Sequence, residues 1–186
     1  MKTASYLSAP TPLGDIGLVW VSGETAPSIV RIFLPEEKLK IEDVIHLYFP
    51  GAVKRRHEIM ERTFQEIQEY LSGAPVVFSS LNFDFSVCSK FQQRVLLQNM
   101  LIHRGFVSTY GRLADELSLP KGARAVGNAL AGNPFPIIIP CHRVVRADGT
   151  PGGYGGGGGP RMKMALLEME GVIFGAEGRV RPECFR

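Results

Sequence analysis

The sequence predicts an α/β (α+β) fold of two modules: a small N-terminal α/β domain with an antiparallel sheet, and a mainly helical C-terminal domain that contains a helix-turn-helix. Three observations support this expectation. Apolar, β-branched runs fill the first third, the composition changes across residues 73–88, and two short helical patterns follow at residues 110–117 and 123–131. We expect the domains to be residues 1–85 and 86–186.

The N-terminal module begins with strands. Residues 16–21 and 29–34 are rich in β-branched and apolar side chains and flank the turn-prone sequence SGETAPS, which predicts a β-hairpin. Residues 56–71 then predict an amphipathic helix, because four apolar residues recur at helical spacing: Met60, Phe64, Ile67 and Leu71.

The C-terminal module opens with a helix. Ser89 followed three residues later by Gln92 fits a capping box, and Gly105 is expected to end this helix. Residues 110–117 and 123–131 then have the lengths and the short connection of a helix-turn-helix. A helical hairpin with no role in DNA binding has the same pattern.

The second of these short helices carries almost no bulky side chains. Its small residues are Ala123, Ala125, Gly127, Ala129 and Ala131. Two explanations are open. Either the helix packs closely against a neighbouring element, or a broad, flat partner approaches its backbone. Arg124 is the one long side chain at its start.

A stiff, apolar approach leads to Cys141. Prolines 134, 136 and 140 forbid a continuous helix, so residues 135–139 are expected to be extended and buried on both sides. Residues 144–146 and the pair Asp148-Gly149 then suggest a short hairpin. After the glycine-rich residues 152–159, Pro160 suits the first turn of a helix that stops at Gly171.

Cys141 is the candidate nucleophile. The odd number of cysteines, with no C-x-x-C pair, indicates reduced thiols, and we interpret Cys88 and Cys184 as inert. A nucleophile needs a fixed position and a lowered pKa, which a neighbouring imidazole can supply. His142 can act on Cys141 only if the chain turns there or a water bridges the two side chains.

Three other roles compete for this Cys-His pair. A zinc site needs about four ligands, and here two adjacent ligands stand alone. A cysteine hydrolase remains open, because Asn133 or Glu170 would be able to orient the histidine. Thiol redox chemistry is disfavoured, because no resolving cysteine is near in sequence.

Composition bounds the broad class. No run of roughly 18 apolar residues predicts a membrane span, and prolines interrupt any signal peptide, so we expect a cytoplasmic protein, or a nuclear one if eukaryotic. The net charge of +3 is uneven: residues 1–90 hold 9 Lys/Arg and 11 Asp/Glu (−2), and residues 91–186 hold 12 and 7 (+5). A basic half permits a polyanionic partner, and a solvated basic face has the same composition.

The motifs of the second half follow the order of a known family. PCHRVV at residues 140–145, preceded by GNPFPIII and ARAVGNAL, resembles the active-site region of the O6-alkylguanine-DNA alkyltransferases, or methylated-DNA–protein-cysteine methyltransferases. The resemblance spans about residues 91–171 and includes STYG at residues 108–111 and GGY at residues 152–154. The N-terminal module resembles the smaller α/β domain of that family.

The resemblance implies DNA repair by direct reversal of damage. The alkyl group of O6-alkylguanine, or less well of O4-alkylthymine, would pass irreversibly to Cys141, once per molecule and without a cofactor. His142 would take the thiol proton through a water, with Glu170 orienting the imidazole. Asn133 would brace the turn that carries Cys141.

The implied partner is double-stranded DNA, bound through the minor groove by a monomer, with the alkylated base flipped into a pocket. Arg124 would fill the gap left by the flipped nucleotide. Tyr110 would displace a phosphate and donate a hydrogen bond to the guanine. Further DNA-binding candidates are Thr109, Ala123, Ala125, Gly127 and Ala131. Pocket candidates are Tyr154, Gly155, Gly156, Val144 and Pro136.

Two features bear on what the resemblance implies. The glycine loop is longer than the family's usual spacing up to the lysine that matches Lys163, so which of residues 155–158 faces the base stays open. Zinc in some members relies on N-terminal cysteines, and none precedes Cys88, so no metal is expected. The alternatives are a non-catalytic, alkyltransferase-like lesion binder, which lacks the active cysteine, and an unrelated cysteine hydrolase.

Overall fold

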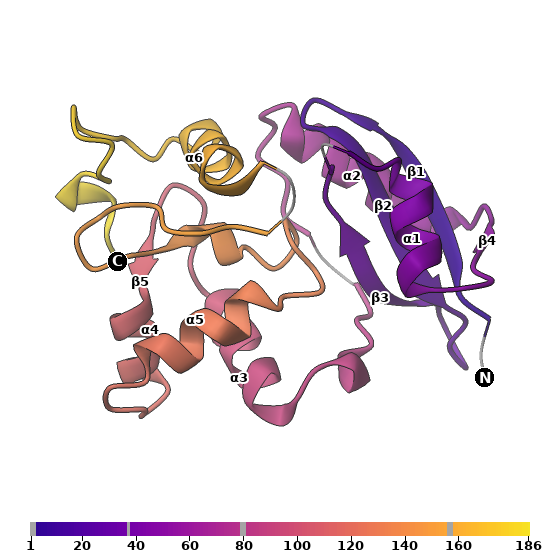
Figure 1. Ribbon diagram of the computed structural model, residues 1–186, viewed down its shortest axis with the longest axis horizontal. Coiled ribbons are helices and arrows are strands. Elements are labelled where there is room, and N and C mark those ends of the chain that lie inside the picture. Colours follow the sequence, from indigo (N-terminus) through magenta and orange to yellow (C-terminus); the bar gives the residue numbers. More distant parts are fainter. Residues whose placement is uncertain (1–2, 37, 79–80, 156–157) are drawn as a thin grey trace. The chain divides into compact units, whose positions relative to one another are not determined.

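A computed structural model describes residues 3–36, 38–78, 81–155 and 158–186 (Figure 1). Its contacts divide the chain into two compact units, Met1–Val87 with Pro134–Ile138, and Cys88–Asn133 with Ile139–Arg186. The mixture of helices and a mainly antiparallel sheet confirms the expected fold class. The first unit includes a short segment that lies just before Cys141 in the sequence.

The first unit is built on a four-stranded sheet in the order β3-β2-β1-β4. Strands β1 (Ser5–Thr11), β2 (Gly14–Val21) and β3 (Ser28–Phe33) pair antiparallel, and the short β4 (Val53–Lys54) pairs parallel with β1. The pairing of β2 with β3 confirms the expected hairpin.

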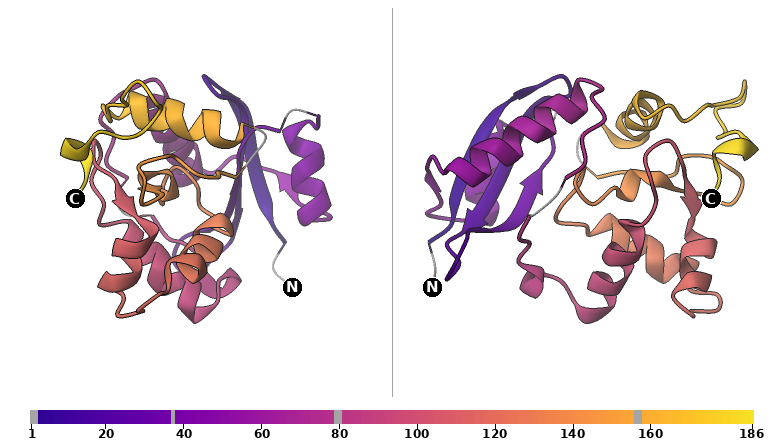
Figure 2. Two further views of the ribbon diagram at one scale, coloured as in Figure 1. Left: turned by 60° about the vertical axis from the view of Figure 1, so that its left-hand side comes forward. Right: turned by 180° about the vertical axis from the view of Figure 1, so that it is seen from behind.

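Two helices cover the opposite faces of this sheet, as the front and rear views show (Figures 1 and 2). Helix α1 (Ile41–Tyr48) packs closely on β2, where a Cβ at Gly17 would lie 2.7 Å from Ile45 Cδ1. Glycine at position 17 therefore permits the close approach. Helix α2 (Glu58–Leu71) confirms the amphipathic helix, and its buried face includes the four expected residues: Met60, Phe64, Ile67 and Leu71.

The second unit is mainly helical. Its helices are α3 (Lys90–Asn99), α4 (Tyr110–Glu116), α5 (Ala123–Ala131) and α6 (Gly159–Met169). Strands β5 (Ser108–Thr109) and β6 (Val144–Val145) pair parallel. One core cluster joins the residue before β5, strand β6, helix α6 and the C-terminal segment; its members are Val107, Val145, Leu167, Val172, Val180 and Cys184. Both short helices of the helix-turn-helix pattern are present, and so is the helix that begins beside Pro160.

Helix α3 begins where expected, with Ser89 as its N-cap, but its capping box is incomplete and it ends earlier than expected. It ends at Asn99 rather than near Gly105, because its last turn tightens: the amide of Ile102 donates to the Asn99 carbonyl at 3.2 Å. At its start Ser89 accepts from the Gln92 amide at 3.1 Å. The Gln92 side chain does not return to Ser89. It donates to the carbonyls of Ala129 and Gly132, at the end of α5.

The expectation that residues 135–139 are extended is wrong, although these residues are buried. The segment runs through turns, and Ile137 has φ 73°. Three flanking prolines remove the amide donors that a strand ladder needs. The segment is held by other contacts: the Ile32 amide donates to the Pro134 carbonyl at 2.8 Å, and Phe135 packs against Phe83 with ring centroids 4.7 Å apart.

The hairpin expected at residues 144–149 is half correct. The turn exists, since the Gly149 amide donates to the Arg146 carbonyl at 3.0 Å. Strand β6, however, pairs with β5 and not with the residues after the turn. Of those residues, Thr150 accepts a hydrogen bond from the Arg146 amide at 3.0 Å, and Pro151 and several glycines, which form strands poorly, then follow. Within the described part of the chain, no helix has the length and apolarity to cross a membrane.

Candidate active site

Cys141 stands on a tight turn whose shape follows from proline. Pro140 has φ −83° and ψ 62°, and the Cys141 amide donates to the Ile139 carbonyl at 2.8 Å, which is the geometry of an inverse γ-turn. A 3-10 turn over Cys141–Arg143 follows, closed by the Arg143 amide on the Pro140 carbonyl at 2.9 Å. The chain therefore turns at the Cys-His pair, which is one of the two conditions that the sequence set.

Two asparagines from separate parts of the chain hold this turn by hydrogen bonds. Asn133, just after α5, donates from Nδ2 to the Ile139 carbonyl at 2.9 Å and to Cys141 Sγ at 3.2 Å. Asn99, at the end of α3, donates from Nδ2 to the Pro140 carbonyl at 3.3 Å. Asn133 therefore contacts both the backbone before the thiol and the sulfur.

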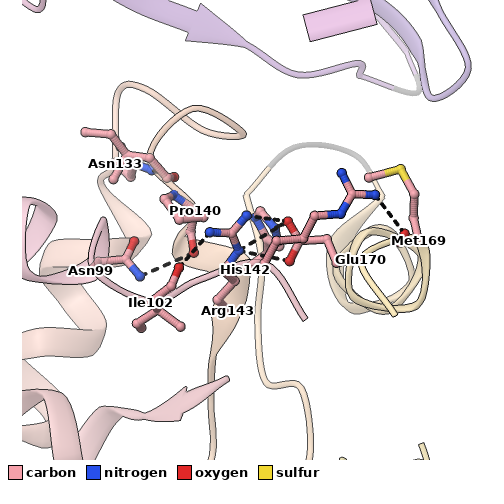
Figure 3. A network of polar contacts seen from close by, with 10 residues as sticks. Asn99, Ile102, Asn133, Pro140, His142, Arg143, Met169 and Glu170 are labelled. Atoms are coloured by element: carbon pink, nitrogen blue, oxygen red, sulfur yellow. Dashed lines mark hydrogen bonds and ion pairs between the residues drawn. The ribbon is translucent and has the colours of Figure 1, made fainter. Parts of the chain in front are cut away.

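Behind the turn lies a buried charged network, drawn in Figure 3. His142 Nε2 is 3.1 Å from Glu170 Oε1, and both side chains are fully buried. Arg143 donates to both oxygens of Glu170, from Nε to Oε2 at 2.9 Å and from Nη2 to Oε1 at 2.6 Å. Its Nη1 donates to the Ile102 carbonyl at 2.6 Å, so Arg143 joins Glu170 to the end of α3.

The network sets the charges of its members. Burial alone would raise the pKa of Glu170, but hydrogen bonds from His142 and Arg143 outweigh it and hold that pKa well below its usual range. Burial lowers the pKa of His142, against the opposing effect of Glu170. A neutral imidazole beside an ionised carboxylate donates Nε2–H to it, which leaves the lone pair on Nδ1.

Burial raises the pKa of the Cys141 thiol, although the hydrogen bond from Asn133 and the nearby charge of Lys163 oppose the rise. The free protein therefore carries a protonated thiol at neutral pH. The sequence suggested that the imidazole would lower this pKa. In the structure desolvation is the larger effect.

Lys163 is buried on α6, with 1% of its surface exposed. Its Nζ donates to the Val144 carbonyl at 2.6 Å, and to the Tyr110 hydroxyl and the Gly153 carbonyl at 3.5 Å each. Burial lowers the pKa of Lys163 to about 8, and the proximity of Cys141 opposes this shift. A cation thus lies beside the pocket that contains the thiol.

The thiol opens onto a pocket of about 370 Å³, within the range typical of small-molecule sites. Its lining residues are Tyr110, Gly127, Leu130, Ala131, Cys141, Gly153, Tyr154 and Gly155. The pocket therefore joins the candidate nucleophile to α4, to the small-residue face of α5 and to the glycine loop. Six of these residues were candidates from sequence.

Thr109 and Val144 belong to the same unit but are not among the lining residues. Thr109 is the N-cap of α4 and accepts from the Arg112 amide at 3.1 Å. The Val144 carbonyl accepts from Lys163, as described above. Pro136 belongs to the first unit, and Gly156 lies outside the described residues.

The surface of α5 bears on the two explanations for its small residues. Arg124, Ala125 and Ala131 are exposed, and Ala123 is half-buried. A Cβ added at Gly127 would meet only the Tyr110 ring, at 3.7 Å, an ordinary contact distance. Ala129 is buried, so packing accounts for its small size. At Gly127 a methyl group would fit, and Ala125 and Ala131 are exposed, so on this part of the helix the structure favours the approach of a flat partner.

The sequence did not predict that Arg143 and Asn99 belong to the site, or that Lys163 is a buried cation beside the pocket. Lys163 had a signal, since it shares the buried stripe of its helix with Leu166, Leu167 and Glu170 at helical spacing, and charged residues are rarely fully buried. No sequence signal marked Arg143 and Asn99, because their hydrogen-bond partners are 27 and 41 residues away in sequence. Among the described residues, no group of three or more His, Cys, Asp or Glu is placed to hold a metal ion.

Comparison with known proteins gives consistent similarities. Residues 90–172 match the family described as 6-O-methylguanine DNA methyltransferase, DNA binding domain. The chain is 38% identical over 161 residues to a methylated-DNA–protein-cysteine methyltransferase of Methanothermobacter thermautotrophicus, covering 87% of this chain and 82% of that relative. It is 32% identical over 164 residues to a DNA base-flipping protein of Thermus thermophilus, covering 88% and 98%. The crystal structure of Mycobacterium tuberculosis OGT in complex with DNA superposes with a TM-score of 0.71 at 30% identity, covering 89% of this chain and 92% of that one.

Proposed function

Because the chain belongs to the methylated-DNA–protein-cysteine methyltransferase family, we propose that it repairs DNA by transferring the alkyl group of O6-alkylguanine to Cys141. The observation that carries the proposal is the placement of one thiol, on a turn braced by Asn133, at a pocket of about 370 Å³. A displacement reaction needs such a fixed sulfur, because the attack must be in line with the bond that breaks. O4-alkylthymine is expected to react less well.

Deprotonation of the thiol is the first chemical requirement. The raised pKa of Cys141 keeps the free protein unreactive, so a base must take the proton when the substrate is bound. His142 is the base, acting through a water from its Nδ1 atom. Glu170 stays ionised beside Arg143 throughout, so it orients the imidazole and stabilises the imidazolium but does not itself accept the proton.

The transfer itself makes one bond and breaks one. The sulfur of Cys141 forms a bond to the alkyl carbon, the bond from that carbon to O6 breaks, and its electron pair passes into the guanine, which then takes up a proton. The product is a thioether, which is a poor leaving group. Each protein molecule therefore acts once, and the reaction needs no cofactor.

We propose that the partner is double-stranded DNA, bound as a monomer through the minor groove. The flat, small-residue face of α5 suits a close approach to the DNA backbone, and the pocket beside it suits a flipped base. Arg124 is exposed at the start of α5, which supports a role in filling the gap that a flipped nucleotide leaves in the duplex. Thr109, Ala123 and Ala125 complete the proposed contact surface. A repair role agrees with a place in the cytoplasm, or the nucleus of a eukaryote.

The test is the intact mass of the protein after incubation with a duplex that contains one O6-methylguanine. We expect one added methyl group per molecule, located on Cys141 by peptide mapping, and no further turnover. Cys141→Ala removes the acceptor and keeps affinity for the duplex. Release of free methylated product with regenerated thiol contradicts the single-turnover mechanism.

Similarity to a DNA base-flipping protein supports a second candidate, which is lesion binding without transfer. The same incubation separates the two. Tight binding of the damaged duplex with no change in mass favours the binder. Cys141 at the pocket favours transfer. A cysteine hydrolase is disfavoured by the names of these relatives.

A further inference from the structure

We propose that Asn99 is a positioning residue for the thiol: by holding the carbonyl of Pro140, it keeps the backbone before Cys141 in the conformation that directs the sulfur toward the alkyl carbon. This inference rests on the proposed alkyl transfer. It adds a second amide side chain, besides Asn133, on which the reaction depends. Removal of this amide is expected to slow the reaction without lowering the stability of the fold.

Two peptide groups lie directly before the Cα atom of Cys141, and each is held by a different asparagine. The carbonyl of Ile139 accepts from Asn133 Nδ2 at 2.9 Å. The carbonyl of Pro140 accepts from Asn99 Nδ2 at 3.3 Å, a bond drawn in Figure 3. The two asparagines therefore act on successive peptide planes, and neither replaces the other.

Pro140 stands in one of two conformations that are open to a proline. The ring restricts φ, so the backbone at this residue changes mainly through ψ. The observed ψ of 62° belongs to the inverse γ-turn, whereas polyproline II has a ψ of about 145° and is the conformer that proline prefers without other contacts. Rotation to polyproline II would turn the peptide plane before Cys141 and with it the direction of the sulfur.

The γ-turn therefore depends on hydrogen bonds, and Asn99 supplies one from outside the turn. The other bonds are short-range: the Cys141 amide donates to the Ile139 carbonyl at 2.8 Å, and the Arg143 amide to the Pro140 carbonyl at 2.9 Å. Asn99 is the last residue of α3 and lies 41 residues away in sequence. Short-range bonds fix the shape of the turn, whereas a bond to a helix fixes its direction within the unit.

The Asn99 side chain is a poor choice for stability alone. It is fully buried, and its Oδ1 atom accepts no hydrogen bond from the described residues. A buried amide oxygen without a donor is unfavourable for folding, and an aliphatic side chain of similar size would remove that penalty. The Pro140 carbonyl would still keep its bond from the Arg143 amide. The contact of Nδ2 with this carbonyl is therefore the reason for an asparagine here.

A simpler role for Asn99 is to stabilise the fold. That role predicts that loss of the amide lowers the free energy of unfolding and changes every reaction of Cys141 alike. A positioning role predicts slowing only where the electrophile is held by the pocket and the sulfur must meet it in line. A small, unbound electrophile such as iodoacetamide turns freely to meet the sulfur, so its rate reports the accessibility and ionisation of the thiol.

The experiment uses Asn99→Leu, which keeps the size of the side chain and removes its donor and its unsatisfied acceptor. We expect the maximal rate of benzyl transfer from O6-benzyl-2′-deoxyguanosine to fall about 3- to 10-fold, because one hydrogen bond changes the ratio of two conformations by up to about tenfold. The substrate concentration at half-maximal rate should be unchanged, since Asn99 is not among the residues that line the described pocket.

Two further measurements separate positioning from folding. Alkylation of Cys141 by iodoacetamide, located by peptide mapping, should stay within about twofold of wild type, because the ionisation of the thiol is not altered. The free energy of unfolding, from chemical denaturation, should equal or exceed that of wild type, because an unsatisfied buried acceptor is gone. Rates of benzyl transfer come from intact mass against time.

Asn128→Leu, the same substitution at an exposed asparagine of the same unit, is the matched control and leaves both rates unchanged. Equal slowing of the two reactions by Asn99→Leu, or benzyl transfer at the wild-type rate, overturns the proposal. Asn99→Ala, which removes the same donor from a smaller side chain, covers the case in which Asn99→Leu does not fold and should give the same contrast between the two reagents. Failure of both variants to fold assigns the amide to stability and also overturns the proposal.

Failure of the proposed function has a different signature. A wild-type protein that gains no benzyl group from O6-benzyl-2′-deoxyguanosine, while iodoacetamide still alkylates Cys141, contradicts alkyl transfer itself. The proposal for Asn99 is contradicted only where wild type reacts and the variants lack the expected contrast. The two failures are therefore distinguishable.

Discussion

Glu170 is the residue on which the charge balance of the site depends. Its carboxylate is fully buried and receives Arg143 through two nitrogens and His142 through one. Burying a carboxylate is unfavourable by itself, and here the bidentate arginine makes the ionised form the stable one. The same carboxylate keeps the lone pair of His142 on Nδ1. The stability of the folded protein and the orientation of the His142 imidazole thus both depend on the Glu170 carboxylate.

Glu170→Gln is predicted to lower the free energy of unfolding by about 3 kcal/mol at neutral pH, because Arg143 is left partly buried without its counterion. Alkyl transfer should slow as well, because an amide stabilises the imidazolium less than a carboxylate. Chemical denaturation and single-turnover rates measure the two effects. Glu168→Gln, an exposed change two residues earlier, serves as the control.

The stability difference between wild type and Glu170→Gln should depend on pH with a definite sign. The folded-state pKa of Glu170 is depressed, so its stabilisation is present above the unfolded value of about 4.3 and is lost as pH falls toward the folded value. The two proteins should therefore differ most above about pH 5 and converge in strong acid. A difference that stays constant down to about pH 2 argues against an ionised Glu170.

At the scale of elements, α5 is exceptional because its exposed face carries small side chains, although no neighbour within the described protein requires small residues there. The added Cβ at Gly127 meets only an ordinary contact, while glycine costs roughly 1 kcal/mol relative to alanine inside a helix. The helix thus gives up stability on the face that lines the pocket. Access for a partner is the physical reason that remains.

Arg124→Ala is predicted to slow repair of O6-methylguanine in duplex DNA about 10- to 100-fold, since only the duplex reaction must hold a gap open at a cost of a few kcal/mol. Reaction with O6-benzyl-2′-deoxyguanosine should be unchanged, because the Arg124 side chain is exposed and does not line the pocket. Arg179→Ala, in the C-terminal segment, is the matched control. Equal slowing with both substrates places the role of Arg124 in folding or chemistry.

At the scale of the whole molecule, charge is distributed unevenly along the chain. The surplus of +5 lies in residues 91–186, which contain the site and α5, while residues 1–90 carry −2. A modest net charge therefore conceals a basic half. Such a distribution favours the encounter of a polyanion with residues 91–186, which contain the candidate site.

Affinity for duplex DNA is predicted to fall linearly on a log-log plot against salt, with a slope of about −0.9 for each phosphate neutralised. Arg124→Ala should leave this slope nearly unchanged if the side chain enters the duplex, and should flatten it by about 0.9 if the side chain contacts a phosphate. Fluorescence anisotropy with Cys141→Ala avoids reaction during the titration. An affinity independent of salt contradicts binding through the basic half.

Much of the secondary structure could be predicted because it depends on local pattern. The strands β2 and β3 and the helices α2, α4, α5 and α6 carry their periodicity and end signals within the element itself. Strand β1 was missed because Pro10 interrupts it. The proline is tolerated since β4 pairs only with Ser5 and Tyr6, which leaves that edge of β1 open at Pro10.

The sequence by itself determined that Cys141, beside His142, is the candidate nucleophile and that α5 presents small residues, because these inferences depend on residue identity and short spacing. The roles of Glu170 and Asn133 followed from the resemblance to the family. Only the tertiary structure decided the charges. Burial protonates the thiol, neutralises His142 and brings the pKa of Lys163 to about 8, and Arg143 keeps Glu170 ionised. Desolvation and ion pairing depend on which distant residues surround a group, and that surrounding exists only once the chain has folded.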